Sequence, residues 1–327
     1  MSPSQGPDQA VQVGIIVLNY HHPVETLACV QRLISQEPTT SRVLWVENDA
    51  ESTRAEALEV LSESGLPIQV IDPSLPCMPS AGTVGVIFNN ENLGYAGGNN
   101  VGLRLLSQLS VPFAWVLNND TQLLEGNSEF LVRAALARPE VGIWGTTILA
   151  EHHRPVPHMV SYMGGRLELR DFSISLVEQP DVLEADPLAY VSGCSLFAAT
   201  HVLESLNYIP YDYFLYYEDP ALTFEARKQG YKVSGVSEVK VHHLESLSTG
   251  RRSPLMEFYN RRNRWFFIQR YFPDHLDRQK RRIWYRIQKW AFRARFDRIR
   301  IEILAFIDFR QGRLGRTHRV FSRRLSD

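Results

Sequence analysis

Residues 113–120 read Phe-Ala-Trp-Val-Leu-Asn-Asn-Asp, in which five apolar residues are followed directly by three polar ones. An apolar run of this length, bounded by turn-forming residues, predicts a buried β-strand over Phe113–Leu117. Asp120 then lies just past the end of that strand. Its carboxylate could bind Mg²⁺ or Mn²⁺, because these cations favour oxygen ligands. Asn and Asp also form ordinary strand-end turns, so this run alone leaves both interpretations open.

The same arrangement occurs three times earlier in the chain. Apolar runs that predict strands lie at Val11–Leu18, Arg42–Glu47 and Thr83–Phe88. Helical spacing follows each of them, at Pro23–Ser35, at Ser52–Ser64 and in a segment that ends near Leu109. This alternation predicts an α/β fold with a mainly parallel sheet that helices cover on both faces. Ligands of such sheets bind at the carboxyl ends of the strands.

Four polar side chains directly follow the predicted strands and should therefore share one edge of the sheet. They are Asn19, Glu47, Asn92 and Asp120. Asn92 belongs to a loop rich in Asn and Gly, residues 89–102, where glycines would let the backbone approach a ligand closely. The loop is neither a Walker phosphate loop nor a dinucleotide fingerprint. We interpret it as a sugar-nucleotide contact, and the alternative is a plain polar loop that leads into a helix.

The pattern changes from about Val160, where short strand-like runs alternate with turns. The aromatic cluster Tyr211–Tyr217 leads into Glu218 and Asp219, and a predicted helix runs from Pro220 to Gly230. An acid at this position could be a general base, although acids also cap helix N-termini.

Two histidines, His242 and His243, end a predicted strand over Val239–His243 that follows another over Lys232–Val236. Imidazole is a common metal ligand when it is paired with carboxylates, although a strand-end histidine is often structural. Neighbouring strand residues point to opposite faces, so we expect at most one of the two to face a site.

The chain has 327 residues, which suits one large α/β domain with an appendage, or two domains. Its net charge of -1 conceals an asymmetry. Residues 251–327 carry 22 Lys and Arg against 7 Asp and Glu, a net charge of +15, and the remainder has a net charge of −16. A basic, aromatic C-terminal part suggests an anionic partner.

Apolar residues recur at helical spacing in this basic part, with arginines between them. They are Phe292, Phe296, Ile299, Ile303 and Phe306. One interpretation is a helix that packs on the body with a solvated basic face, and the other is an interfacial helix on an anionic membrane surface. Nucleic acid is not an expected partner, because no recognition motif is present and the rest of the chain is acidic.

Cysteine usage and hydropathy indicate the compartment. Cys29, Cys77 and Cys194 are widely spaced, which argues against a disulfide framework or a zinc site and favours free thiols. Residues 1–10 are polar and lack the apolar core of a secretion signal. No stretch approaches the roughly 20 apolar residues of a spanning helix. We therefore expect a cytoplasmic protein, with any membrane contact peripheral and on the inner face of the cell membrane.

Taken together and in order, these motifs resemble those of family 2 inverting glycosyltransferases with a GT-A fold, especially the rhamnosyltransferase-like members. The resemblance extends from about residue 11 to 270. It rests on the runs 17–20, 47–48, 92–100, 117–121, 216–219 and 226–231, and on His243 followed by Ser248, Thr249 and Gly250. It implies three parts: a polar segment at 1–10, a GT-A domain at 11–250 and a basic helical extension at 251–327.

The resemblance also implies roles for individual residues. Asp120 and His243 would bind the divalent cation, and Asp219 would be the general base. The donor, a nucleotide-diphosphate sugar, would contact Asn19, Glu47, Asn119 and Asp120, with Glu47 facing the base. The glycine-rich loop would line the donor through Asn92, Gly94, Gly97, Asn99 and Asn100. Tyr217 and Glu218 would lie on the acceptor side.

Two positions depart from the family pattern. Ala221 stands where relatives often have a second Asp, and Glu47 replaces the usual Asp. The implied function is transfer of a sugar, with inversion, from a dTDP- or UDP-sugar to a glycan or lipid-linked acceptor in cell-surface polysaccharide synthesis, with dTDP-rhamnose as one candidate donor. The alternative, which Ala221 favours, is a catalytically inactive scaffold subunit that binds nucleotide-sugars. The sequence does not indicate the oligomeric state.

Overall fold

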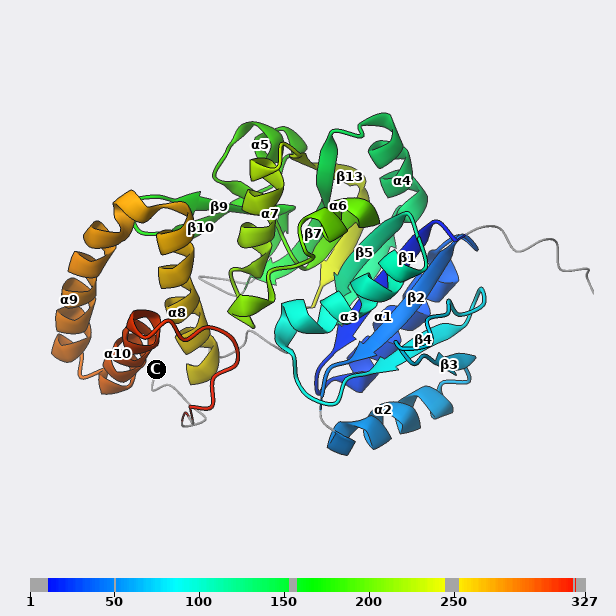
Figure 1. Ribbon diagram of the computed structural model, residues 1–327, viewed down its shortest axis with the longest axis horizontal. Helices are drawn as coiled ribbons and strands as arrows, with labels where there is room; N and C mark the ends of the chain where they lie inside the picture. Colours follow the sequence, from blue (N-terminus) through cyan, green and yellow to red (C-terminus); the bar gives the residue numbers. More distant parts are fainter. Residues whose placement is uncertain (1–10, 50, 153–157, 245–252, 320, 322–327) are drawn as a thin grey trace, which may run out of the picture.

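The computed structural model describes residues 11–49, 51–152, 158–244, 253–319 and 321. These residues form a ten-stranded mixed sheet with helices on both faces, a separate three-stranded sheet and a group of C-terminal helices (Figure 1). The predicted α/β architecture is therefore confirmed. Ser248, Thr249 and Gly250, three of the residues that carry the resemblance, lie outside the described residues.

The first half of the chain alternates strands and helices as predicted. Its elements are β1 (Val13–Asn19), α1 (Pro23–Gln36), β2 (Ser41–Glu47), α2 (Glu51–Glu63), β3 (Ile68–Val70), β4 (Val84–Phe88), α3 (Gly94–Gln108) and β5 (Phe113–Asn118). The strands pair in the order β3-β4-β2-β1-β5, and each of these pairs is parallel. Asn19 is in register with Glu47, and Leu18 with Asn118. The carboxyl ends of the central strands therefore meet at one edge.

The second half extends the same sheet and adds the smaller one. Its elements are β6 (Thr121–Glu125), α4 (Ser128–Ala137), β7 (Val141–His152), β8 (His158–Tyr162), β9 (Gly164–Glu168), β10 (Ser173–Val177), α5 (Pro180–Ala185), β11 (Ala189–Val191), β12 (Ser195–Ala199), α6 (Thr200–Ser205), the 3₁₀ helix η1 (Tyr211–Tyr213), α7 (Glu218–Lys228) and β13 (Lys232–His243). The large sheet continues from β5 through β12, β7 and β13 to β6, and β12 is antiparallel to both neighbours. A turn at residues 192–194 separates β11 from β12, so these two strands, although close in sequence, belong to different sheets.

Alternating side chains build a core on each face of the large sheet. Ile15 and Val17 pack with residues of α1, α2 and α4, whereas Ile16 packs with residues of α3, α6 and α7. The side chains of Trp45 and Trp115 are fully buried in the first of these layers. The large apolar area removed from water on both faces fixes the register of β1, because a shift by one residue would exchange the two sets.

Strand β13 is a single strand with an irregularity, where we expected two strands. Val236 pairs with Thr146 of β7, and the next paired residue, Lys240, lies opposite Thr147. Three residues, 237–239, are therefore extra on β13. An odd number of extra residues reverses the alternation of faces along the strand. As a result, Val241 and His243 lie on the same face as Val236, and Val236 and Val241 both pack in the core layer of α1 and α4.

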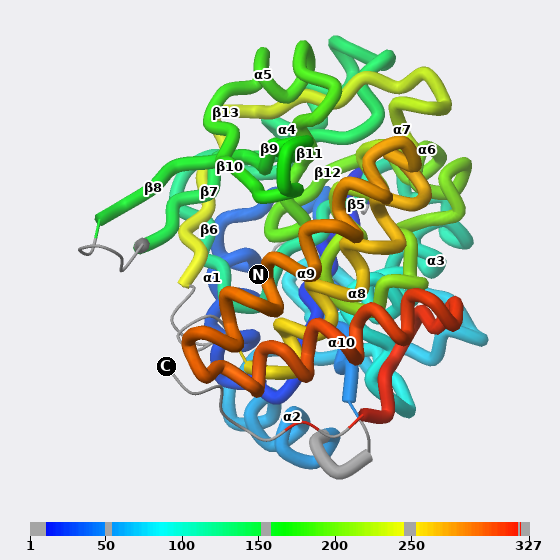
Figure 2. The backbone as a smooth tube through the Cα atoms, turned by 90° about the vertical axis from the view of Figure 1, so that its left-hand side faces the viewer, coloured from blue at the N-terminus to red at the C-terminus, as the bar shows by residue number. Residues whose placement is uncertain are grey.

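The C-terminal part consists of α8 (Pro254–Tyr271), the 3₁₀ helix η2 (Pro273–His275), α9 (Leu276–Phe292) and α10 (Phe296–Arg310). These helices stand beside the sheet domain, with α9 at the outer edge of the molecule (Figures 1 and 2). Glu302 of α10 is fully buried and forms ion pairs with Arg261 of α8 and Arg286 of α9. This cluster joins the three helices, and removing one partner of such a buried pair is strongly destabilising.

The prediction of one continuous apolar stripe from Phe292 to Phe306 is wrong. Helix α9 ends at Phe292, Ala294 adopts a left-handed conformation with φ 51°, and α10 starts at Phe296. The residues at helical spacing thus lie on two helices. Phe306 packs against Trp265 in the interior, whereas Phe292 is 94% exposed.

Among the helices of the described residues, none combines the length and the apolar character that a membrane span requires. The three-part division into 1–10, 11–250 and 251–327 stays a prediction. Its first segment and its boundary at 250/251 both fall outside the described residues.

Candidate active site

The ends of β1 and β2 form a buried polar pair at the carboxyl edge. Asn19 Nδ2 donates to Glu47 Oε2 at 2.7 Å, and Trp45 Nε1 donates to the same oxygen at 3.1 Å. Burial raises the pKa of Glu47 to about 7. Because the Glu47 side chain is 0% exposed, it lies beneath the surface and orients Asn19. Its predicted contact with a nucleotide base stays a prediction that this burial does not favour.

Asn19 also organises the start of α1 and the end of β5. Its Oδ1 accepts a hydrogen bond from Thr26 Oγ1 at 2.7 Å. Asn119 Nδ2 donates to Thr26 Oγ1 at 2.9 Å and lies 3.4 Å from Asn19 Oδ1. The structure thus brings Asn19, Glu47 and Asn119 together as predicted. Thr26 was missed, because nothing in its local sequence distinguishes it from other helical threonines.

Asn48, the residue after Glu47, holds the glycine-rich loop in place. Its Nδ2 donates to Asn92 Oδ1 at 3.2 Å and to the Gly94 carbonyl at 3.0 Å. Its Oδ1 accepts from Asn89 Nδ2 and from the Leu93 amide, each at 3.1 Å. All four bonds are satisfied inside the protein, so Asn48 fixes the loop next to the ends of β1 and β2.

The predicted loop residues differ in what they can offer a ligand. Gly94 has φ +75° and its backbone packs against the Phe214 carbonyl, so a side chain there would collide with main chain. Gly97 and Asn99 lie in the first turns of α3, and Asn99 Nδ2 donates to the Tyr95 carbonyl at 2.9 Å. Asn100 exchanges two hydrogen bonds with the backbone of Ile209. Those bonds tie α3 to the chain ahead of η1 and do not favour the predicted donor contact of Asn100.

Asp120 and His243 form a close pair at the same edge. Asp120 Oδ1 lies 3.1 Å from His243 Nε2, and Tyr162 Oη lies 3.4 Å from His243 Nδ1. Burial alone would lower the pKa of His243, but its contacts with Cys194 and Asp120 raise it to about 11. The bulge in β13 places His243 here, so the expectation that at most one of the two histidines faces the site agrees with the strand geometry.

The residue types of this pair fit a divalent cation, which would have to displace the proton that His243 holds. A carboxylate and an imidazole side by side supply two ligands, and Mg²⁺ or Mn²⁺ commonly takes its remaining ligands from water and phosphate oxygens. In the described part of the chain no cluster of three or more His, Cys, Asp or Glu side chains could hold a metal ion. A cation at Asp120 and His243 could take further ligands from water or from phosphate oxygens.

The acids of α7 follow a backbone in a rare conformation. Phe214, Tyr216 and Tyr217 have φ values of 67°, 68° and 75°, and Tyr217 caps α7 directly before Glu218 and Asp219. Asp219 is partly exposed and its Oδ2 accepts a hydrogen bond from the Gly193 amide at 3.2 Å. Glu218 is buried, and among the described residues its Oε2 has no hydrogen-bond partner.

The two acids have different pKa values, and burial raises both. Loss of water raises the pKa of Asp219 to about 6, whereas burial together with the Asp219 charge raises the pKa of Glu218 to about 8. At neutral pH the pair therefore holds about one proton, which resides mainly on Glu218. Asp219 is ionised and reachable, as a general base must be. The predicted acceptor-side roles of Glu218 and Tyr217 stay predictions, and both side chains are buried.

The turn between β11 and β12 connects the two halves of the site. Gly193 donates to Asp219, and its carbonyl accepts the Tyr95 hydroxyl from α3. The next residue, Cys194, accepts a bond from the Asn118 amide at 3.0 Å and contacts His243 through its side chain. The base candidate and the cation candidate therefore flank one turn. Sequence reasoning missed this turn, because nothing in the sequence shows that 192–194 returns to β5.

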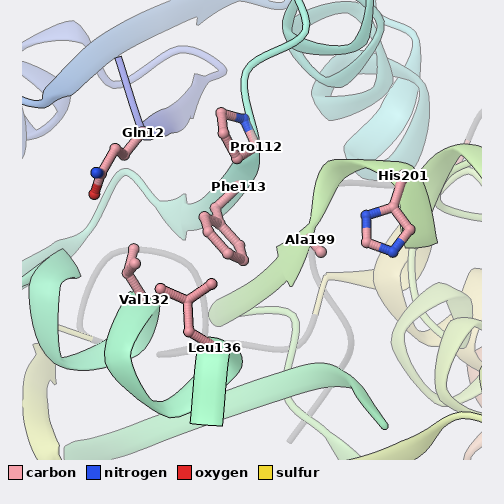
Figure 3. Close-up of a pocket in the computed structure, with 7 residues that line it drawn as sticks. All are labelled: Gln12, Pro112, Phe113, Val132, Leu136, Ala199 and His201. Carbon is pink, nitrogen blue, oxygen red and sulfur yellow. The ribbon is translucent and has the colours of Figure 1, made fainter. Parts of the chain in front are cut away.

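One cavity lies away from this site. A mostly apolar cavity of about 380 Å³ is lined by Gln12, Pro112, Phe113, Val132, Leu136, Ala199 and His201 (Figure 3). Gln12 precedes β1 and Pro112 precedes β5, so the cavity opens at the amino ends of these strands. It is therefore at the edge opposite the candidate site.

No protein-family model matches the chain. The low-salt glycan biosynthesis hexosyltransferase Agl10 of Haloferax volcanii is 25% identical over 196 residues, which is 59% of this chain and 62% of that protein. The match therefore spans less than two thirds of the relative's length.

Two solved structures have the same fold. The mannosyltransferase PcManGT of Pyrobaculum calidifontis, in complex with GDP-Man and Mn²⁺, matches with a TM-score of 0.52 at 15% identity and covers 94% of this chain and 90% of its own. Residues 1–349 of S. aureus TarS, in complex with UDP-GlcNAc, match with a TM-score of 0.51 at 16% identity, over 93% and 82% of the two chains. The fold of this protein is that of GT-A glycosyltransferases, which confirms the predicted fold class.

The proton on Glu218 should make stability depend on pH. Because its folded-state pKa lies above the ordinary 4.5, protonated Glu218 favours the fold at low pH, and this stability is lost as the pH rises toward 8. In Glu218→Gln the melting temperature should fall less between about pH 5 and pH 8 than in wild type, by an amount equivalent to roughly 1–3 kcal/mol. Calorimetry across this range measures the two slopes.

The exposed Glu204→Gln is the matched control and should keep the wild-type slope. Equal slopes in Glu218→Gln and wild type would contradict the assignment of a proton to Glu218.

Proposed function

We propose that the protein transfers a sugar from a nucleotide-diphosphate sugar to an acceptor hydroxyl, with inversion at the anomeric carbon. The observation that carries the proposal is that one turn contacts both the candidate base and the candidate cation ligands. The Gly193 amide donates to Asp219, and Cys194 contacts His243, which lies beside Asp120. The hexosyltransferase relative and the donor-bound neighbours, one with GDP-Man and one with UDP-GlcNAc, support the class of reaction. The donors favoured by the family resemblance are dTDP- and UDP-sugars, dTDP-rhamnose among them.

In this mechanism Asp219 accepts the proton of the acceptor hydroxyl. The freed oxygen forms a bond to the anomeric carbon from the face opposite the diphosphate, and the bond from that carbon to the phosphate oxygen breaks. Asp120 and His243 would hold a divalent cation, which would supply positive charge next to the leaving diphosphate. The Gly193 amide steadies the ionised form of Asp219 and fixes its direction.

The alternative function is an inactive scaffold that binds nucleotide-sugars. Its support in the sequence is Ala221, which stands where relatives often have a second Asp. In the structure Ala221 is fully buried in an aromatic cluster with Tyr213, Tyr217 and Phe267. An acid at this position would be placed among apolar rings, so Ala221 is accounted for by packing against α8. This weakens the argument for lost activity, and the acids at Asp120 and Asp219 are both in place.

Substitution of either acid should strongly slow transfer. Asp219→Asn cannot accept the proton, and Asp120→Ala loses a cation ligand, so each should lower kcat by roughly 10²–10³. Wild-type activity should also decline tenfold per pH unit below about pH 6, where Asp219 becomes protonated. A radiolabelled-sugar transfer assay with an accepted donor and acceptor measures both effects.

Asp212→Asn, which alters an exposed acid of η1, is the control and should retain activity. Near-normal transfer by Asp219→Asn would contradict the mechanism. If the wild type binds the donor without turnover, the result would support the alternative of an inactive scaffold.

The donor can be identified by stabilisation. We expect one family of nucleotide-sugars among dTDP-, UDP- and GDP-linked compounds to raise the melting temperature with Mn²⁺ or Mg²⁺, since a ligand at 100 times its Kd adds about 2.7 kcal/mol. A thermal-shift screen with each cation is the measurement. In Asp120→Ala the cation-dependent part of the shift should disappear. A shift that is identical with and without cation would argue against a metal at Asp120 and His243.

We also propose that the protein works in the cytoplasm at the inner face of the cell membrane, where a lipid-linked glycan acceptor would be found. Support comes from one face of α9 and its turn into α10. Trp284, Tyr285, Phe292 and Phe296 are 65–94% exposed there. Exposed cations accompany them, namely Arg281, Lys289 and Arg293. Aromatic rings between basic side chains suit an anionic lipid surface, and α9 forms the outer edge of the molecule (Figure 1).

Membrane binding should depend on these aromatic residues. We expect the wild type to co-sediment with vesicles that contain phosphatidylglycerol, and less so at high salt, because charge attraction is screened. Trp284→Ser combined with Phe292→Ser should lose most of this binding. Leu75→Ser, at an exposed apolar residue of the sheet domain, is the control. Sedimentation that is equal for all three proteins, or absent for wild type, would refute the proposal.

A further inference from the structure

The loop before α7 holds three non-glycine residues in the left-handed region within four positions. Phe214, Tyr216 and Tyr217 all have φ values between 67° and 75°. Such conformations are unfavourable for residues with a Cβ and persist only where the surroundings determine them. Tyr217 is also the N-cap of α7, so the conformation of this loop sets the direction in which the helix, and with it Asp219, begins.

One side chain of the C-terminal extension holds this loop. Asn263 of α8 is 0% exposed, and its Nδ2 donates to the carbonyls of Tyr213, Leu215 and Tyr216 at 2.8, 2.7 and 2.9 Å. An amide nitrogen carries two hydrogens, so at least one of them is shared between two carbonyls. Convergence of three carbonyls on one nitrogen requires the observed turn of the backbone.

Asn263 is itself fixed in orientation. Arg262 Nε donates to Asn263 Oδ1 at 3.0 Å, and the same guanidinium reaches the Gly315 carbonyl at 2.8 Å. Gly315 returns a backbone bond to the Asp212 carbonyl at 2.6 Å. Hydrogen bonds from α8 and from the segment after α10 therefore hold the loop in place. The carbonyl of Phe214 accepts the Tyr95 amide, which belongs to the glycine-rich loop, at 2.9 Å.

We propose that Asn263 is a positioning residue for transfer: it holds the left-handed loop that aims Asp219, and so makes the C-terminal extension part of the active site. This inference rests on the proposed function, with Asp219 as the base. It follows that loss of the amide donors should misdirect the base while the donor sites on β1, β2 and β5 stay intact. The expected signature is a fall in kcat without a matching loss of donor binding.

The test uses Asn263→Asp and Asn263→Ala in the full chain. Asn263→Asp keeps the size of the side chain but replaces the donating nitrogen by oxygen. We expect both variants to lower kcat by 10- to 100-fold, with KM for the donor and the donor-induced thermal shift within about threefold of wild type. If Asn263→Ala does not fold, Asn263→Gln, which keeps an amide but displaces it by one methylene, replaces it and should show an intermediate kcat.

A matched control removes another buried amide of the extension. Gln279 of α9 is buried, and its Nε2 donates to the Arg170 carbonyl at 3.2 Å. Gln279→Ala should lower the melting temperature and leave kcat unchanged. Wild-type kcat in folded Asn263→Asp would overturn the inference, as would an equal fall of kcat in Gln279→Ala. The Asp219→Asn variant distinguishes a failure of this inference from a failure of the proposed function. If Asp219→Asn is as active as wild type, the proposed function fails, whatever the Asn263 variants show.

Discussion

The hydrogen bond from the Gly193 amide to Asp219 is the contact on which the rest of the site depends. It brings α7, which packs on the smaller sheet, against the turn that enters β12 of the large sheet. A side chain at Gly193 would crowd this contact, since a Cβ would lie 2.9 Å from the Tyr95 hydroxyl. A larger residue at this position would therefore have to displace Tyr95, which glycine leaves in place between the glycine-rich loop and the turn.

The first half of the fold could be predicted because its information is local. Apolar runs and intervening helical spacing identify β1, β2, β4 and β5, and parallel pairing then requires Asn19, Glu47 and Asp120 to share an edge. The second half could not be predicted to the same extent. The insertion of β12 between β5 and β7, and the separation of β11 from β12, arise from long-range pairing that leaves no periodic signal.

Side-chain roles were harder to predict than positions. Glu47 lies where expected, yet its carboxylate turns inward to Asn19 and Trp45. Asn100 lies in the expected loop region but bonds to Ile209, which is 109 residues away. Asn263 gave no signal at all, since an asparagine among arginines in a helix resembles a solvated face. Its role depends on carbonyl groups, and the sequence does not show where those point.

The basic C-terminal part shows how a total charge differs from a surface charge. Arg261 and Arg286 are neutralised inside the helix group by Glu302, and Arg319 pairs with Asp308. Arg262 is largely buried and bonded to backbone carbonyls. The cations that a surface could meet are therefore fewer than the 22 of residues 251–327. Three of the exposed ones, Arg281, Lys289 and Arg293, lie on α9 and its turn into α10, among the exposed rings.

The three extra residues of β13 have a consequence for how this site could change over time. Because alternation along a strand has a period of two, the parity of an insertion decides which side chain reaches the sheet edge. Insertion of one residue within 237–239 would bring His242 to the place of His243 beside Asp120 without altering either codon, whereas a deletion would bring Leu244 there. Two adjacent histidines therefore let the site keep an imidazole beside Asp120 after a one-residue insertion in this irregularity.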